Sequence, residues 1–386
     1  MASLLVLTLV LSGCRIYGDE YLVISKHIEQ HQESDDSDGL TAENYSELKA
    51  AIDTLVINCI DSGVIRLQNY SGDVGADVST CLENLMSDPL GVYAIEYIPP
   101  FELTRLLTYY EVTVNITYRR TKEQIDSVLQ FGTVNDYVQA LEKTCADYGG
   151  IITAFVPSAV LSQVDVQDSL DRYHYNNPFD SLARPEFSYK RYPDTGNFII
   201  RRIIEVELGY KETADELRSM SAGLRQRANE LTEDIDPKKT EPLQVIAKLF
   251  ATAMNETEYL PGREDDISSE IVFDSGFTAY GALIEGSAAS EGYALAFKAL
   301  CDLMEIECTV VIGRYNGLRH CWNLVKYNDS WYHVDASLND YLRENYFLKT
   351  DEQFLETHKW NTTSYTACDG EIIEYPVSAN YSAGNE

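Results

Sequence analysis

Basic residues are scarce in this chain of 386 residues. It has 30 lysine and arginine residues against 62 aspartate and glutamate residues, a formal net charge of -32 at neutral pH. A protein that binds nucleic acid neutralises phosphates with clustered lysine and arginine. The charge balance therefore argues against nucleic acid as a partner, and it favours a soluble, well-solvated surface.

The apolar run at the start of the chain, Leu4 to Leu11, is too short to span a bilayer comfortably as a helix. It is followed by Ser-Gly-Cys14, and small residues in this place are typical of a signal peptide. Leu-Ser-Gly-Cys resembles the bacterial lipobox, which implies cleavage before Cys14 and attachment of diacylglycerol to its sulfur. The absence of lysine or arginine before the run departs from the usual pattern. A truncated membrane anchor and a signal without lipid are the alternatives.

We predict residues 1–14 to be a lipoprotein signal peptide with Cys14 as the lipidated residue. Two lipid chains on one cysteine anchor a protein stably where a single chain does not. The acidic stretch within residues 15–44 is predicted to be a flexible tether. The expected location is the extracytoplasmic face of the cell membrane.

Without Cys14, seven cysteines remain, and an odd number argues against a complete disulfide framework. Their spacings do not resemble zinc-binding motifs, and we predict neither a metal site nor a cofactor. Free buried cysteines are expected. Cys301 and Cys308 are a pair that could meet, if a helix end approaches the start of a strand.

The chain is long enough for two domains. Asp236-Pro237 marks the predicted boundary, between residues 45–235 and residues 236–386. In the first of these domains, helices are predicted over 47–59, 78–86, 121–148 and 211–233, strands over 63–69, 92–98, 109–118 and 198–208, and a loop-rich stretch over 176–197. These elements do not alternate strictly, so we expect an α+β domain of antiparallel character, without a predicted role. A helix over residues 242–254 is expected to open the second domain.

Three short motifs follow in the second domain. A turn of small residues places Ser290 two residues before Gly-Tyr-Ala, at the start of a helical pattern. His320-x-Trp-Asn and a segment Trp-Tyr-x-Val-Asp335 come next, on two predicted strands. Tyr346-Phe-Leu and His358-Lys-Trp close the series.

In order and spacing, these motifs resemble the catalytic core of the transglutaminase-like superfamily, relatives of the papain-like thiol enzymes, in its bacterial secreted branch. The resemblance spans about residues 240–360 and implies a papain-like α+β domain. Ser290 stands where the family has its nucleophilic cysteine. The resemblance implies that His320 is the general base and that Asp335 orients it.

Ser290 is predicted to lie at a helix N-terminus, where partial positive charge favours a thiolate. The partial positive charge of a helix N-terminus does not ionise a hydroxyl. Ser290 would therefore attack a substrate only if a base removed its proton. Asn328-Asp329 is a good hairpin loop. A loop of two residues would place His320 opposite Ser337. Asp335 would then lie diagonally across on the same face, within reach of the imidazole of His320.

No other thiol replaces the missing one. Cys321 follows His320 on a strand and points to the other face. Cys301 lies 11 residues after Ser290, about 16 Å along a helix. Glu291 is expected to be exposed, and the remaining residues are expected to have structural roles: Trp322 and Trp331 in packing, and His333 as an ordinary satisfied histidine.

Ser290, His320 and Asp335 are thus the predicted site residues. The leading hypothesis is a membrane-anchored extracytoplasmic lipoprotein whose transglutaminase-like domain is a pseudoenzyme that binds peptide, protein or cell-wall material. The alternative is a serine-based peptidase, amidase or acyltransferase that uses the three residues. A third hypothesis is a structural surface module in which the first α+β domain binds the ligand.

Overall fold

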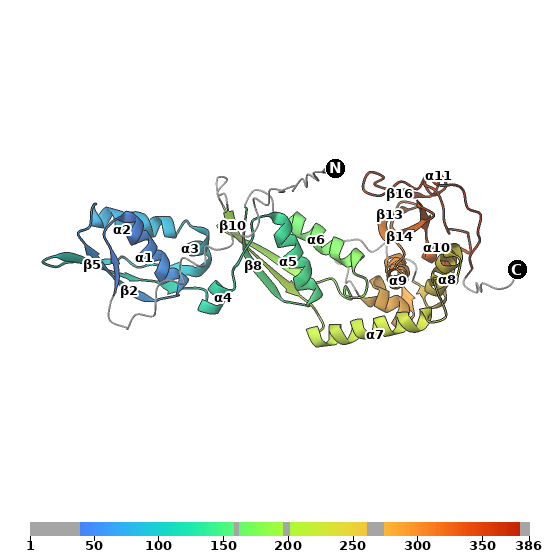
Figure 1. Cartoon of the computed structure of the whole chain (residues 1–386), viewed down its shortest axis with the longest axis horizontal. Helices are drawn as coiled ribbons and strands as arrows, with labels where there is room; N and C mark the ends of the chain where they lie inside the picture. The colour runs from blue at the N-terminus through green and yellow to red at the C-terminus, as the bar shows by residue number, and fades with distance from the viewer. Residues whose placement is uncertain (1–38, 158–161, 196–200, 261–273, 379–386) are drawn as a thin grey trace, which may run out of the picture. The chain divides into compact units, whose positions relative to one another are not determined.

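The computed structural model describes residues 39–157, 162–195, 201–260 and 274–378 (Figure 1). Cys14 and the signal peptide lie outside the described residues, as do most residues of the predicted tether. The chain divides into two compact units, residues 1–130 with 192–203 and residues 131–191 with 204–386. The predicted boundary at Asp236 lies within the second unit.

The first unit contains a sheet with the strand order β1-β2-β5-β4. β1 pairs with β2 in parallel and the other pairs are antiparallel. Buried residues alternate along β2 and β5, the helix α1 packs against β1 and β2, and α2 packs against α1. The elements are β1 (Leu40–Ala42), α1 (Tyr45–Ile57), β2 (Ser62–Gln68), α2 (Val74–Leu85), β4 (Glu102–Arg105) and β5 (Tyr109–Asn115).

Two predictions in this part of the chain were only partly right. The strand predicted over residues 92–98 is confirmed as β3 (Ile95–Tyr97), but its first residues belong to α3 (Pro89–Ala94), because Asp88 caps a helix that begins at Pro89. The helix predicted over 121–148 is two helices, α4 (Lys122–Asp126) and α5 (Val134–Ala146). Each has its own capping box, at Thr121 and at Thr133, and the second starts a new helix after Gly132. The short strands are β6 (Thr117–Tyr118) and β7 (Leu129–Gln130).

The second unit begins with α5 and a sheet in which β8 (Ile151–Pro157), β10 (Arg201–Gly209) and β9 (Glu186–Tyr192) lie side by side in that order. α5 and α6 (Gln163–Asn176) pack against one another over a core that includes Tyr137 and Val206. β9 lies in the stretch predicted to be loop-rich. Its half-buried aromatic residues mostly alternate with exposed polar ones, a strand pattern that was not predicted. α7 (Ala214–Thr232) agrees with the predicted helix.

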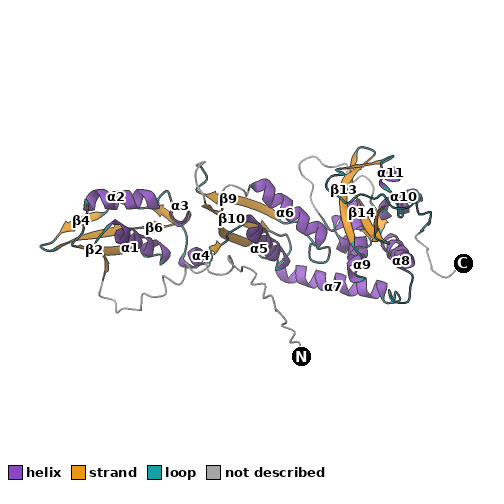
Figure 2. Cartoon of the chain, turned by 45° about the horizontal axis from the view of Figure 1, so that its top comes forward, coloured by secondary structure: helices purple, strands orange, loops and turns teal. Residues whose placement is uncertain are grey.

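The last part of this unit surrounds one central helix, α9 (Ser290–Leu303), beside a sheet with the strand order β15-β14-β13-β16 (Figure 2). Every residue from Ser290 to Cys301 is buried, because α8 (Pro242–Asn255), the sheet and α10 (Ala336–Leu342) all contact α9. The strands are β13 (Cys308–Tyr315), β14 (Leu318–Tyr327), β15 (Ser330–Val334) and β16 (His358–Trp360). The short elements are β11 (Glu258–Tyr259), the 3-10 helix η2 (Ser275–Phe277), the π-helix η3 (Gly281–Glu285), β12 (Ser287–Ala288) and α11 (Asp351–Phe354).

The hairpin between β14 and β15 has the predicted loop of two residues. Tyr327 pairs with Ser330, and Asn328 and Asp329 both have positive φ, 47° and 63°. This is the backbone conformation that favours asparagine and aspartate in two-residue hairpin loops. The hairpin sets the register between the strand that carries His320 and the strand that leads to Asp335.

Across the described ranges, we find no helix with the length and apolar character that a membrane span requires.

Candidate active site

Ser290 is the first residue of α9, as predicted. Close packing holds the turn before it in place. Ala289 donates its backbone N–H to the carbonyl of Gly276 at 3.0 Å. A Cβ atom on Gly292 would lie 2.7 Å from that same carbonyl oxygen and 2.6 Å from the Cβ of Ala288, so only glycine fits there.

The Ser290 hydroxyl contacts the strand that carries His320. Its oxygen accepts the backbone N–H of Cys321 at 3.1 Å. Ser290 has no exposed surface, and only 2% of His320 and 1% of Asp335 are exposed. The three predicted residues are therefore all buried in the second unit.

His320 and Asp335 are in direct contact, since His320 Nε2 lies 2.6 Å from Asp335 Oδ2. The geometry differs in one detail from the expected strand pairing. β15 ends at Val334, and Asp335 caps the N-terminus of α10 by accepting the N–H of Leu338 at 3.0 Å. Ser337 therefore does not pair with His320, and its hydroxyl donates to Asp335 Oδ1 at 2.7 Å.

A second histidine shares Asp335. His358 Nε2 lies 3.3 Å from the Oδ2 atom that also contacts His320. Burial by itself raises the pKa of Asp335, but the neighbouring His320 and His358 lower it more, so the net pKa lies well below the usual range. Asp335 is thus a buried carboxylate that stays ionised. No role was predicted for His358, although it belongs to the motif His-Lys-Trp.

Trp322 and His333 form a separate hydrogen-bonded chain. Trp322 Nε1 donates to His333 Nδ1 at 2.8 Å, and His333 Nε2 lies 2.8 Å from Asp351 Oδ1. Burial lowers the pKa of His333 to about 4, so the ring is neutral at neutral pH. This confirms the prediction of a satisfied histidine, and Trp322 is a buried packing residue as expected.

Two groups of side chains in the described residues have the composition of metal ligands: His320, Asp335 and His358, and His333, Asp351 and Cys368. In the second group, Trp322 occupies Nδ1 of His333, so its Nε2 carries a proton and has no lone pair for a metal. In the first group, both imidazoles already contact the carboxylate oxygen that a metal would need. The hydrogen bonds account for both groups, and we assign no metal to either.

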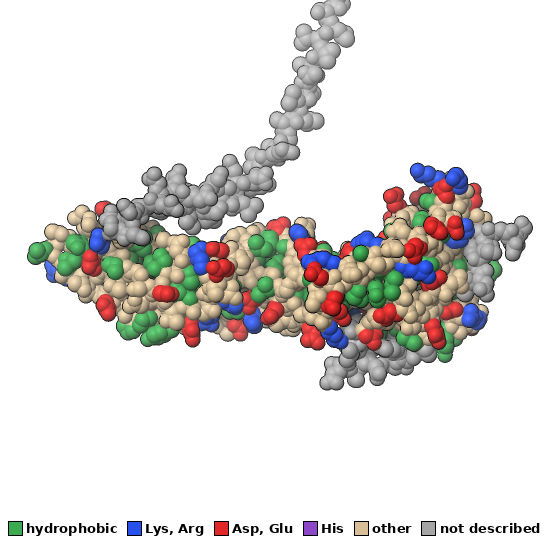
Figure 3. Space-filling model, turned by 90° about the horizontal axis from the view of Figure 1, so that it is seen from below, with side chains coloured by type: hydrophobic (Ala, Val, Ile, Leu, Met, Phe, Trp, Pro, Cys, Tyr) green, Lys and Arg blue, Asp and Glu red, His purple; other side chains and the backbone are tan. Residues whose placement is uncertain are grey.

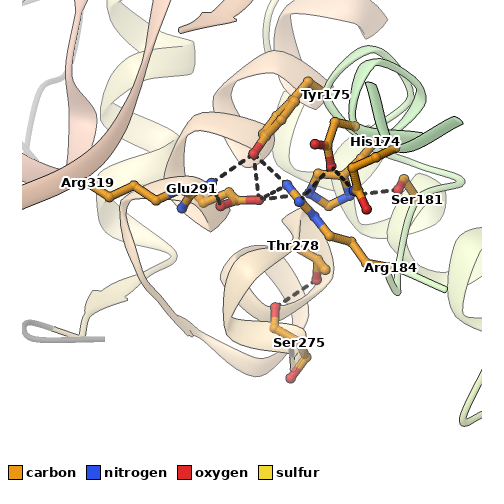
Figure 4. Close-up of polar contacts among 10 residues, drawn as sticks. His174, Tyr175, Ser181, Arg184, Ser275, Thr278, Glu291 and Arg319 are labelled. Carbon is orange, nitrogen blue, oxygen red and sulfur yellow. Dashed lines mark hydrogen bonds and ion pairs between the residues drawn. The ribbon is translucent and has the colours of Figure 1, made fainter. Parts of the chain in front are cut away.

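Glu291 is fully buried, so the expectation that it is exposed was wrong. Its carboxylate lies 2.7 Å from a guanidinium nitrogen of Arg184 and 2.7 Å from one of Arg319. His174 Nε2 lies 3.1 Å away, and the hydroxyl of Tyr175 donates to the carboxylate at 3.2 Å. Figure 4 shows these side chains converging on Glu291, with Ser181 hydrogen-bonded to His174 on the side away from Glu291.

The two arginines explain why a carboxylate is tolerated in this interior. Burial raises the pKa of Glu291, but Arg184 and a hydrogen bond from His174 outweigh that effect and leave the pKa well below the usual range. Burial and the nearby Arg184 lower the pKa of His174, which therefore stays neutral. α6 and the segment that follows it thus hold the first turn of α9, one residue from Ser290. No short-range signal predicts this cluster, because Arg184 precedes Glu291 by 107 residues.

Residues 229–336 match the family model of the transglutaminase-like superfamily. The matched range includes Ser290, His320 and Asp335. It confirms the predicted fold class, an α+β structure with a transglutaminase-like, papain-like domain. No curated protein sequence matches the chain.

Solved structures show distant similarity. One is described as a crystal structure of a TGase; it is 11% identical, covers 69% of this chain and 71% of its own, and has a TM-score of 0.29. Another is a candidate cysteine protease from Cytophaga hutchinsonii; it is 14% identical, covers 40% of this chain and 62% of its own, and has a TM-score of 0.23.

Proposed function

We propose that this protein is a membrane-anchored extracytoplasmic lipoprotein whose transglutaminase-like domain is catalytically degenerate. Its role is to bind peptide, protein or cell-wall material. One observation carries the loss of catalysis: Ser290 is fully buried and its hydroxyl accepts the backbone N–H of Cys321.

This geometry disfavours acyl transfer for two reasons. A substrate carbonyl has to come within about 3–3.5 Å of the attacking oxygen, and no surface of Ser290 is open to it. The start of α9 stabilises a thiolate but does not ionise a hydroxyl. The His320 and Asp335 pair then serves to hold β14, α10 and β16 together.

Activity-based labelling tests the loss of catalysis. The purified full chain is treated with a fluorophosphonate, and the modified residue is identified by mass spectrometry. We expect no label on Ser290, and labelling of Ser290 in the folded protein would overturn the proposal.

A complementary variant, Ser290→Cys, tests whether burial by itself keeps substrates from residue 290. We expect residue 290 to stay unreactive toward thiol-directed peptide probes once it is cysteine, because this position has no exposed surface. Seven native cysteines lie among the described residues, so any labelled peptide has to be mapped. Labelling of residue 290 that is lost when His320→Ala is added would contradict the burial argument.

The second candidate function is a serine-based peptidase, amidase or acyltransferase. The contact of 2.6 Å between His320 and Asp335 favours it, because this contact orients a general base. Labelling of Ser290 that disappears in the His320→Ala variant would establish this function in place of the first.

The proposed lipid anchor is supported by the apolar run Leu4 to Leu11 and by Cys14 after it. The mass of the N-terminal peptide from membrane fractions tests it. We expect a diacylglycerol on Cys14 and its loss in a Cys14→Ser variant. An unmodified cysteine in the natural membrane would refute the anchor.

A further inference from the structure

The hairpin between β4 and β5 in the first unit exposes leucine side chains at its tip. Leu103, Leu106 and Leu107 are all exposed, and Leu107 has the largest exposed fraction among the large hydrophobic residues of the described chain. Leu106 donates its backbone N–H to the carbonyl of Tyr109 at 2.8 Å, which places Leu107 and Thr108 at the turn. Figure 1 shows this hairpin extending beyond the helices of its unit.

The turn itself does not require leucine. Tight hairpin turns favour glycine, asparagine and aspartate, whose backbones adopt positive φ readily. Two other hairpins in the described residues follow that rule, with Asn316-Gly317 between β13 and β14 and Asn328-Asp329 between β14 and β15. A cluster of exposed leucines at a turn marks a surface that contacts another apolar phase.

Charge is distributed along this hairpin in a way that fits a membrane interface. The eight residues from Leu103 to Tyr110 include no acidic residue, in a chain that has 62. Their one basic residue, Arg105, has its guanidinium 5.7 Å from the ring centre of Tyr110. Glu111 lies further from the tip and pairs with Arg66 at 3.3 Å. Figure 3 shows hydrophobic side chains gathered at this end of the unit.

Aliphatic residues at the tip, with tyrosine and arginine behind them, are the pattern of segments that enter the bilayer interface. We propose that the β4–β5 hairpin inserts its leucines into the lipid bilayer. The inference rests on the proposed lipid anchor, because that anchor keeps the first unit beside a membrane.

The length of chain between anchor and hairpin permits this contact. Twenty-four residues lie between Cys14 and Gly39, and β1 begins at Leu40 in the same sheet as β4 and β5. An extended chain of that length spans at most about 90 Å. A tether of this kind raises the local concentration of the hairpin at the bilayer. Even a weak affinity of the leucines for lipid is then sufficient to keep the hairpin inserted.

Apolar contact rather than charge attraction has to drive the insertion. The net charge of -32 opposes binding to anionic lipids. The hairpin tip from Leu103 to Tyr110 has no acidic group of its own to add to this repulsion. We therefore expect insertion into uncharged phosphatidylcholine.

A tryptophan reporter tests the proposal. The full chain with Leu107→Trp is reconstituted into phosphatidylcholine vesicles, with or without brominated acyl chains that quench indole. The emission of the unsubstituted chain, with its three natural tryptophans, is subtracted. We expect a roughly twofold loss of the added emission, because an inserted side chain lies about 5–10 Å into the headgroup and acyl boundary.

Two variants control this measurement. Val164→Trp introduces the reporter at an exposed apolar position on α6 in the second unit, and its emission should not change with bromination. Leu103→Trp should be quenched, and adding Leu107→Asp to it should remove the quenching. Equal emission of the Leu107→Trp protein in both kinds of vesicle would overturn the proposal.

The experiments can refute the proposed lipid anchor and the proposed insertion independently of one another. A lipidated Cys14 with an unquenched Leu107→Trp reporter refutes the insertion and leaves the lipoprotein proposal intact. An unmodified Cys14 with a quenched reporter refutes the anchor, and the hairpin is then a membrane-binding element on its own.

Discussion

At the scale of single residues, the oxygen of Ser290 has a structural partner. The buried hydroxyl accepts a backbone N–H from β14, so it helps to join α9 to the sheet. Glu291, the next residue, joins α9 to α6 and the segment after it through buried charge. Two successive side chains thus fix the first turn of the central helix from two directions.

Replacing Ser290 with alanine should lower the free energy of unfolding by about 1 kcal/mol, because the N–H of Cys321 loses this acceptor inside the protein. Urea unfolding of the two proteins measures the difference. The exposed Ser87→Ala change is the control and should have little effect. Equal stability of the Ser290→Ala and natural proteins would contradict the structural role of the hydroxyl.

Replacing Glu291 with glutamine should be more damaging. The change removes the carboxylate that neutralises Arg184 and Arg319, and breaking a buried ion pair costs about 3 kcal/mol. The matched change Glu356→Gln alters an exposed glutamate and should leave the unfolding midpoint unchanged. If both variants unfold at the same urea concentration, the buried cluster does not stabilise the fold.

At the scale of elements, helix packing decides which glycines can be replaced. Gly292 lies on α9 against the Gly276 carbonyl, whereas Gly223 lies on α7 with no atom within 4 Å of the place a Cβ would take. The same substitution should therefore have opposite effects on the two helices.

Gly292→Ala should destabilise the protein by about 1–3 kcal/mol through overpacking. Gly223→Ala should stabilise it by about 0.5–1 kcal/mol, because alanine is the better helix former. Thermal unfolding of both variants measures these changes. A stabilising effect of Gly292→Ala would mean that α9 is not packed as closely as its contacts indicate.

At the scale of the whole molecule, buried ionisable groups link stability to pH. His174, His333 and His358 have lowered pKa values, chiefly because burial disfavours the charged ring. The unfolded chain binds more protons than the folded one below the ordinary histidine pKa of about 6.5, so acid favours unfolding. Asp335 and Glu291 act in the same direction at lower pH, because their pKa values are also depressed.

Stability should therefore fall as the pH drops from 7 to 4. The lowered pKa of about 4 at His333 contributes up to roughly 3 kcal/mol to this loss. Urea midpoints at several pH values measure it, in 0.5 M salt to screen the repulsion among surface carboxylates. Constant or rising stability toward pH 4 would show that these histidines are protonated equally in both states.

Local chemistry in the sequence was enough to predict several features of the second unit. Ser290 begins a helix, the Asn328-Asp329 loop has two residues, and the motif series identifies the transglutaminase-like domain. Each of these depends on residues close together in the chain, such as turn formers and periodic apolar side chains.

Only the tertiary structure revealed what surrounds those residues. The burial of Glu291 depends on Arg184, which lies in a different part of the chain, and the sharing of Asp335 by His320 and His358 depends on the pairing of β13 with β14 and β16. The sequence by itself determined that Ser290 begins a helix and that the hairpin turns at Asn328-Asp329. The packing of distant segments decided that Ser290 is enclosed, because burial and charge pairing arise from contacts that no short motif contains.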